Sequence, residues 1–387
     1  MKKTLAALAV LGAFAGTAAA ADVTLYGVAD LGLKYTYNDA DNGTSSTNKL
    51  EMKSGNQAGS RFGLKGTEEL GNGLKIGFVL ENGFSADDGT LGQSSRLFGR
   101  EANVYLTGDF GTLSFGRVGN LQSGNGSYGL TGDLSPFGTS WGGSVEGSTY
   151  FVGMTRMDNV VTYVSPSFAG VQISAQYSFN VNSKDTELGT GDALAEGKSA
   201  ATRYGALGAT YKNGGLKLAL VADWWNWSSK NFADADDGFT VTAGGSYDFG
   251  VLKAFLGAQY FDNFYGNTNP TEDVSGVDTF SPLTIDGSAQ GYAVMAGVDV
   301  PAFGGNALFA VGYTDAESAN AGTADKTYDQ EFSRLGASVG YTYALSKRTN
   351  VYAVGAYYED EIRNNLDTTK NRDPKTGIVY LGLRHRF

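Results

Sequence analysis

Hydrophobic and polar residues alternate along most of the chain with a period of two, which is the pattern of β-strands. Between Val23 and Tyr37 the odd positions are mainly apolar, and the even positions are mainly polar or small. The same alternation returns at 62–66, 74–81, 172–179, 334–343 and 378–387. The first stretch is longer than the strands of about five to six residues that are usual in soluble proteins.

Two kinds of connection alternate between these stretches. Short ones have turn residues, as in Gly71-Asn72-Gly73 and Ser165-Pro166-Ser167. Long ones are polar and acidic, at 38–58, 84–95, 119–155, 180–201, 228–238, 262–288, 315–331 and 359–375. The chain is therefore predicted to be an all-β antiparallel meander of sixteen strands, with eight long loops at one end and seven short turns at the other. No change of composition marks a second domain within 21–387.

The polar face of these strands does not suit a soluble sandwich, because it carries charges in the middle of strands beside Gly, Ser, Thr and Gln. A closed sheet of sixteen strands is wide enough to hold water inside. Its apolar face can then contact lipid, with aromatic residues gathered at the strand ends. Tyr35, Phe179, Trp224, Tyr343 and Phe387 lie at such ends. The pattern thus favours a transmembrane β-barrel with a polar lumen.

The amino-acid composition excludes several classes of function. The chain has no cysteine, which excludes a disulfide framework, a thiolate metal site and a cysteine nucleophile. Its single histidine, His385, shares the apolar face of the last strand, so neither an enzyme nor a multi-histidine metal site is expected. No cofactor is predicted. The net charge of −11 also argues against nucleic acid as a partner.

The first twenty residues have the features of an export signal. Lys2 and Lys3 precede a short apolar run from Leu5 to Phe14, and Ala18-Ala19-Ala20 provides small residues for cleavage. The run is too short to span about 30 Å of hydrocarbon as a helix. We expect 1–20 to be a cleaved signal peptide, and 21–387 to be the mature chain.

Several segments together carry a family resemblance. They are DVTLYG at 22–27, SRFGLKGTEELGNGLKIGF at 60–78, GDFGTLSFGR at 108–117, RMDNVVTYVSPSFAG at 156–170, YKNGGL at 211–216, ALSKRTNVY at 344–352 and VYLGLRHRF at 379–387. In this order and spacing they resemble the Gram-negative general diffusion porins, in particular the β-proteobacterial and neisserial branch. The resemblance implies a homotrimer of sixteen-stranded barrels in the cell outer membrane, with short periplasmic turns and long outer loops.

The same resemblance implies a passive channel for small hydrophilic solutes and ions. It also implies contact with lipopolysaccharide and outer-membrane lipid, and assembly by machinery that reads a terminal aromatic residue, here Phe387. In the family the third long loop, here 119–155, folds into the barrel and narrows the pore. Basic residues on the facing wall oppose acidic residues on that loop.

Five basic residues are candidates for that wall: Arg61, Arg117, Arg156, Arg100 and Lys65. The first three match wall arginines of the family. Alternation turns Arg61, Lys65 and Arg156 inward. It groups Arg100 with the outward Ala102, and it places Arg117 outward unless the strand has a bulge near Gly116.

The predicted constriction has few acidic residues, because Asp133 and Glu146 are the only ones in 119–155. We therefore expect a net positive constriction and a modest anion preference. A substrate-selective porin for an organic anion or a sugar is the alternative, since Tyr128 and Trp141 of the loop are aromatic. A closed, adhesive barrel is a further alternative. Acidic outer loops could also hold divalent cations together with lipopolysaccharide.

Overall fold

The computed structural model describes residues 22–43, 45–124, 126–138, 141, 147–182, 201–227, 236–265, 283–319 and 328–387. The predicted signal peptide, 1–20, lies outside these residues. The strands are β1 (Asp22–Asp39), β2 (Thr47–Ser54), β3 (Arg61–Gly71), β4 (Leu74–Gly83), β5 (Glu101–Gly108), β6 (Gly111–Gly119), β7 (Arg156–Val164), β8 (Val171–Ser178), β9 (Arg203–Asn213), β10 (Leu216–Asn226), β11 (Gly238–Asp248), β12 (Lys253–Tyr265), β13 (Ser288–Ala302), β14 (Gly305–Ser318), β15 (Gln330–Ala344), β16 (Thr349–Asn364) and β17 (Lys375–Arg386). Four short helical turns join them: α2 (Gly92–Ser95), η1 (Thr131–Leu134), α3 (Gly147–Tyr150) and η3 (Thr368–Lys370).

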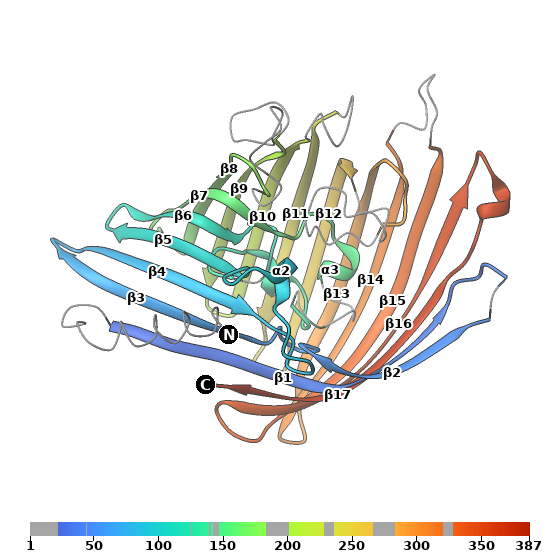
Figure 1. The fold of residues 1–387 in the computed structure, drawn as a ribbon, viewed down its shortest axis with the longest axis horizontal. Coiled ribbons are helices and arrows are strands. Elements are labelled where there is room, and N and C mark those ends of the chain that lie inside the picture. The colour runs from blue at the N-terminus through green and yellow to red at the C-terminus, as the bar shows by residue number, and fades with distance from the viewer. Residues whose placement is uncertain are drawn as a thin grey trace, which may run out of the picture.

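All strand pairs are antiparallel, and the sheet closes on itself. Strand β1 pairs with β17 over Val28–Asp39, and Figure 1 shows the blue first strand beside the red last one. On its other side β1 pairs with β2 in its second half and with β3 in its first half. These two short strands therefore occupy one position, and the barrel has sixteen strands as predicted.

The first long connection differs from the predicted loop at 38–58. Residues Thr47–Ser54 form strand β2, which pairs with Leu31–Asn38 of β1. The alternation of this segment is hidden by the charged residues Lys49, Glu51 and Lys53 on either side of Leu50 and Met52. Those two apolar side chains are 70% and 56% exposed, because they lie on the outward face.

The outward face of the barrel is apolar along the alternating positions. Leu33, Leu256 and Leu335 are about half to two thirds exposed, at 49%, 64% and 63%. Phenylalanines stand at four of the short turns: Phe110, Phe168, Phe249 and Phe303. Exposed apolar residues in a continuous band with aromatics at its edge suit contact with lipid. No helix among the described residues is both long and apolar enough to cross a membrane.

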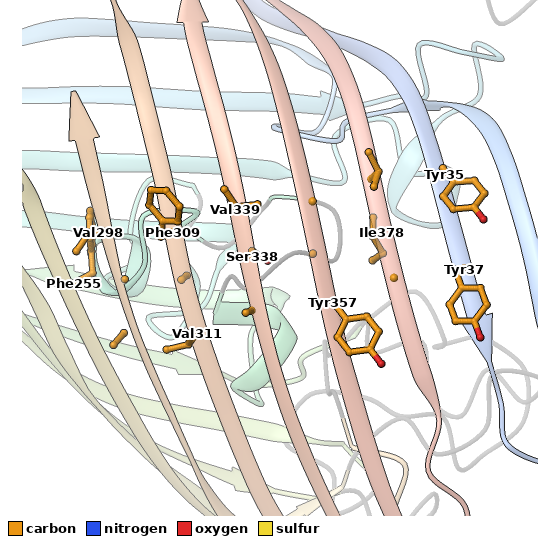
Figure 2. Close-up of a pocket in the computed structure, with 18 of the residues that line it drawn as sticks. Tyr35, Tyr37, Phe255, Val298, Phe309, Val311, Ser338, Val339, Tyr357 and Ile378 are labelled. Carbon is orange, nitrogen blue, oxygen red and sulfur yellow. The ribbon is translucent and has the colours of Figure 1, made fainter. Parts of the chain in front are cut away.

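An apolar groove of about 950 Å³ lies on this outward face over β12–β17 and β1. Figure 2 shows its outward side chains, which include Tyr35, Tyr37, Val298, Phe309, Val311, Val339 and Tyr357. The groove lies between these side chains because the residues there are small: Ala296, Ala337, Gly355 and Gly377.

Candidate functional site

The long connection between β6 and β7, residues 120–155, leaves and rejoins the sheet at adjacent residues. Gly119 of β6 and Arg156 of β7 are paired across the two strands. Asn120 closes the base of the loop: its backbone nitrogen donates to the Thr155 carbonyl oxygen at 3.0 Å, and its side-chain amide donates to the Gly153 carbonyl oxygen at 2.6 Å. The strand ladder is thus complete without the loop.

The loop runs inside the barrel against the inner faces of β10–β17. Figure 1 shows α3, which belongs to the loop, in the interior beside β13 and β14. Leu134, Phe137, Tyr150 and Phe151 are at most 1% exposed. They pack with inward side chains of the wall: Ala293, Met295, Leu308, Val354 and Tyr380. Burying each large apolar side chain stabilises the loop position by about 1.5–3 kcal/mol.

Glycines on the inner wall make room for these side chains. A Cβ atom added at Gly312 would lie 2.8 Å from the Tyr150 ring, and one at Gly340 would lie 2.9 Å from Phe137. An added Cβ atom would also come close to a loop side chain at five further glycines: Gly208, Gly244, Gly257, Gly297 and Gly336. Part of the high glycine content of the chain is therefore explained by close approach of the loop.

Polar contacts fix the loop in addition. The Gln259 side chain accepts a hydrogen bond from the Val152 nitrogen at 2.7 Å and donates one to its carbonyl oxygen at 3.1 Å. The buried Arg334 donates to the Thr149 carbonyl oxygen at 3.2 Å and forms an ion pair with Asp360. The loop is held at several separate points on the wall.

Asp133, the predicted acidic residue in η1, contacts lysines rather than arginines. Its carboxylate is 3.1 Å from the Lys217 ammonium on β10 and 3.2 Å from that of Lys253 on β12. Burial by itself would raise the pKa of Asp133, but the hydrogen bond from Lys217 and the charge of Lys253 hold this pKa below its ordinary value. The Asp133 carboxylate thus forms ion pairs with two lysines. The other predicted acid, Glu146, lies outside the described residues.

A pH prediction follows from the Asp133 contacts. A lowered carboxyl pKa means that the ion pairs stabilise the loop above the ordinary aspartate pKa of about 3.9, and that this stabilisation is lost as pH falls through the lower folded value. Protonation leaves Lys217 and Lys253 without their counter-charge, so anion preference should rise in that acidic range. Reversal potentials from pH 7 to pH 3 would measure it. Asp133→Asn should show the higher preference already at pH 7 and should lack the Asp133 step; equal reversal potentials at pH 7 would contradict the assignment.

The facing wall contains a second segment that points inward, residues 55–60 between β2 and β3. The buried carboxylate of Asp30 accepts hydrogen bonds from the backbone nitrogens of Gln57 and Ala58, at 2.9 and 2.6 Å. The Tyr352 hydroxyl donates to the same carboxylate. The Gln57 side chain in turn accepts a hydrogen bond from Asn350 at 2.9 Å. Asp30 therefore holds this segment beside the first residue of β3, Arg61.

Arg61 shares an acidic partner with Arg100. The Glu81 carboxylate lies 2.6 Å from the Arg100 Nε atom and 3.5 Å from the Arg61 Nε atom. Arg156, at the start of β7, lies within electrostatic range of Arg100, Arg117 and Glu81. Glu101 also acts on Arg156, but its carboxylate accepts hydrogen bonds from the backbone and side chain of Ser127 in the loop. The structure thus places Arg61, Arg100 and Arg156 together.

Arg117 lies at an irregularity of the sheet. The register of β6 and β7 shifts between Gly116 and Val118, and Gly116 has a φ of +136°. The Arg117 guanidinium contacts Asp158 at 2.6 Å and donates to the Gly99 carbonyl oxygen at 2.7 Å. Asp158 also pairs with Arg96 at 3.0 Å. The charge of Arg117 is therefore directed to Asp158.

Lys65 and Phe387 form no ion pair with this group in the described residues, although the Tyr26 hydroxyl beneath Lys65 donates to Glu81 at 3.0 Å. The Lys65 ammonium stands over the Tyr26 ring at 5.3 Å from its centroid. The terminal residue Phe387 pairs with Gly27, whose nitrogen and oxygen are 3.0 and 3.1 Å from the Phe387 backbone oxygen and nitrogen.

A cavity of about 380 Å³, here called the constriction cavity, separates the loop from the facing wall. Gly124 and the stretch from Gly132 to Gly138 line it on the loop side, together with Trp141. Gln57, Ala58, Arg61 and Arg384 line it on the other side, while Lys253 and Asp299 come from β12 and β13, on the wall against which the loop packs. The lining thus holds three cationic side chains, Arg61, Lys253 and Arg384, and two carboxylates, Asp133 and Asp299, and Asp133 is shared with Lys217 outside the lining. The lining of the constriction cavity is therefore cationic by one charge.

Sequence reasoning missed several charged residues of the site. Arg384 and Lys217 both occupy inward positions of alternating strands, so alternation carried a signal for them. Glu81 was also inward by alternation, but its pairing with two arginines required the fold. Lys253 follows a short turn, where the alternation had not yet begun.

Comparison with known proteins gives consistent results. The family model described as Gram-negative porin matches residues 6–363. The chain is 36% identical to an outer membrane porin protein of Bordetella pertussis and 29% identical to outer membrane porin protein 32 of Delftia acidovorans, each over the full length of both chains. Its fold is similar to that of an anion-selective porin from Comamonas acidovorans, with a TM-score of 0.61 and 24% identity over 95% of this chain and all of the other.

Proposed function

Because this chain belongs to the Gram-negative porin family and forms a diffusion channel in the outer membrane, we propose that its pore prefers small anions over cations. Family members are passive channels, so the function concerns which solutes pass and not bond chemistry. The proposed selectivity determinant is the group formed by Arg61, Arg100, Arg156 and Arg384, called the arginine cluster from here on.

One observation carries this proposal: three cationic side chains, Arg61, Lys253 and Arg384, line the constriction cavity against two carboxylates, Asp133 and Asp299. Glu81 is shared by Arg61 and Arg100, and Asp133 is shared by Lys217 and Lys253. Arginine stays charged at any pH that the channel meets, and its planar donors suit oxyanions. Charges that line a narrow pore select for ions of the opposite sign. Charges more than about 8 Å from a passing ion are largely screened at physiological salt, so the lining of the cavity has the largest effect.

Planar-bilayer recording of the detergent-purified protein tests the proposal. Across a tenfold KCl gradient we expect a reversal potential on the anion side, with large ohmic openings. A reversal potential at zero or on the cation side would contradict it. Small openings that one sugar or organic anion blocks in a saturable manner would instead support the substrate-selective alternative.

The family also supports proposals about assembly. We expect a homotrimer, so that openings occur in groups of three. Lipopolysaccharide is the expected lipid partner of the outer half of the barrel. Phe387 is the expected signal for the assembly machinery; its backbone closes the barrel against Gly27, and its ring covers that glycine.

A further inference from the structure

A second cationic cavity lies at the short-turn end of the barrel, below the constriction cavity. It measures about 230 Å³ and is called the exit pocket here. Lys347 and Arg348 come from the turn between β15 and β16, while Arg384 and Arg386 come from the inner face of β17. The backbone nitrogen of Arg386 donates to the Arg348 carbonyl oxygen at 2.8 Å, which ties the turn to β17.

The lining of the exit pocket is cationic. None of its described lining residues is an aspartate or a glutamate. The ion pairs found among the described residues include none of these four side chains; the buried Asp30, opposite Arg384 in the register of β1 and β17, attracts Arg384 from outside the pocket lining. Elsewhere on the inner wall the structure pairs its arginines, as in Arg334 with Asp360 and Arg100 with Glu81. Four like charges in one cavity repel one another, so an anion between them is favoured.

The exit pocket adjoins the constriction cavity. Gln57 and Arg384 line both. The Nε atom of Arg384 donates to the Asn350 side chain at 3.0 Å, and Asn350 donates to Gln57 at 2.9 Å. This chain of hydrogen bonds fixes the guanidinium and leaves its two terminal nitrogens for a ligand. Arginine presents such paired donors to oxyanions in a bidentate manner.

We propose that the exit pocket is a binding site for small multivalent oxyanions, of the size and charge of phosphate, in series with the constriction. Drug-sized ligands occupy pockets of about 300–1,000 Å³. The smaller volume here fits a compact anion that has passed Arg61 and reaches Arg384, Arg386 and Arg348 in turn. This site rests on the proposed function only in that the anion arrives through the pore.

The test compares phosphate binding by the wild-type protein and by Arg348→Gln/Arg386→Gln, both in detergent micelles. These side chains are exposed at the pocket rim, so the variant keeps the barrel contacts. Calorimetric titration with inorganic phosphate should show affinity falling about tenfold or more in the variant, because two of four cations are lost. The matched control is Lys370→Gln/Arg372→Gln in the loop between β16 and β17, which removes the same charge and should bind phosphate like the wild type.

A second readout separates this proposal from the selectivity proposal. Phosphate added on the short-turn side should inhibit chloride current through the wild type and the control, and inhibit the exit-pocket variant at least tenfold less potently. Equal phosphate affinity in wild type and variant overturns the exit pocket, even if the pore prefers anions. Phosphate binding that the variant loses, in a channel that prefers cations, overturns the selectivity proposal and leaves the pocket standing.

Discussion

Reversing the charge of Arg61 and Arg156 together, as Arg61→Glu/Arg156→Glu, is expected to turn anion preference into cation preference. Two unit charges 4 Å apart in water interact by about 1 kcal/mol, and 1.4 kcal/mol corresponds to a factor of ten. The double variant changes the charge of the wall by four units, so the ratio of anion to cation permeability should fall by about tenfold or more. Reversal potentials in a KCl gradient measure this ratio directly.

The charge-reversal variant needs a matched control. Lys370→Glu/Arg372→Glu makes the same change of charge in the loop between β16 and β17, and it should leave the reversal potential at the wild-type value. Arg61→Gln/Arg156→Gln guards against misfolding, because glutamine retains hydrogen bonding without the charge; it should give an intermediate shift. Unchanged selectivity in both arginine variants would remove these residues from the proposed selectivity wall.

Excising the interior loop should widen the channel. Gly119 and Arg156 are already paired across β6 and β7, so residues 123–151 can be replaced by two glycines while Asn120 and Thr155 still close the base. Conductance follows the narrowest cross-section of a pore, so it should rise roughly two- to threefold. Anion preference should fall as well: in the wider pore ions pass farther from Arg61, Lys217 and Lys253, and this distance outweighs the loss of Asp133. Single-channel recording measures both quantities.

Two comparisons make the excision informative. Replacing 366–371 in the loop between β16 and β17 by two glycines removes an outer segment and should leave conductance unchanged. Phe137→Ala/Tyr150→Ala keeps the loop but removes two of its buried contacts, each worth about 3–5 kcal/mol in well-packed cores. This variant should show broader and noisier conductance than the wild type. Wild-type conductance after excision would mean that the loop does not set the narrowest point.

The barrel could be predicted from the sequence because the alternation of side chains along a strand is a local property. Each strand residue points to the side opposite its neighbours, so the sequence of Val23–Tyr37 is enough to separate Leu33 on the outward face from Asp30 on the inward face. Turn residues and polar runs marked where strands end. Strand β2 was missed because its inward positions, including Lys49 and Glu51, are charged like those of a loop.

The ion-pair partners of the charged residues could not be predicted in the same way. Asp133 lies 84 residues from Lys217 and 120 from Lys253, and only closure of the barrel brings the three together. Alternation placed Arg117 on the outward side unless a bulge lay near Gly116; the register shift found there directs its guanidinium to Asp158, a partner that the sequence did not indicate. Such pairings depend on strand register and on the path of the loop, which no local pattern encodes.

By itself, the sequence determined that this chain is a closed sheet of sixteen strands with an apolar outside and a polar inside, since side-chain direction follows from backbone geometry one residue at a time. Its motifs placed the chain in the porin family. Only the tertiary structure decided which charges are neutralised and which remain free for a solute. That outcome depends on distances between residues far apart in the chain: Glu81 and Asp133 are each shared by two cations, while the exit pocket that Arg384, Arg386 and Arg348 line has no acidic residue in its described lining.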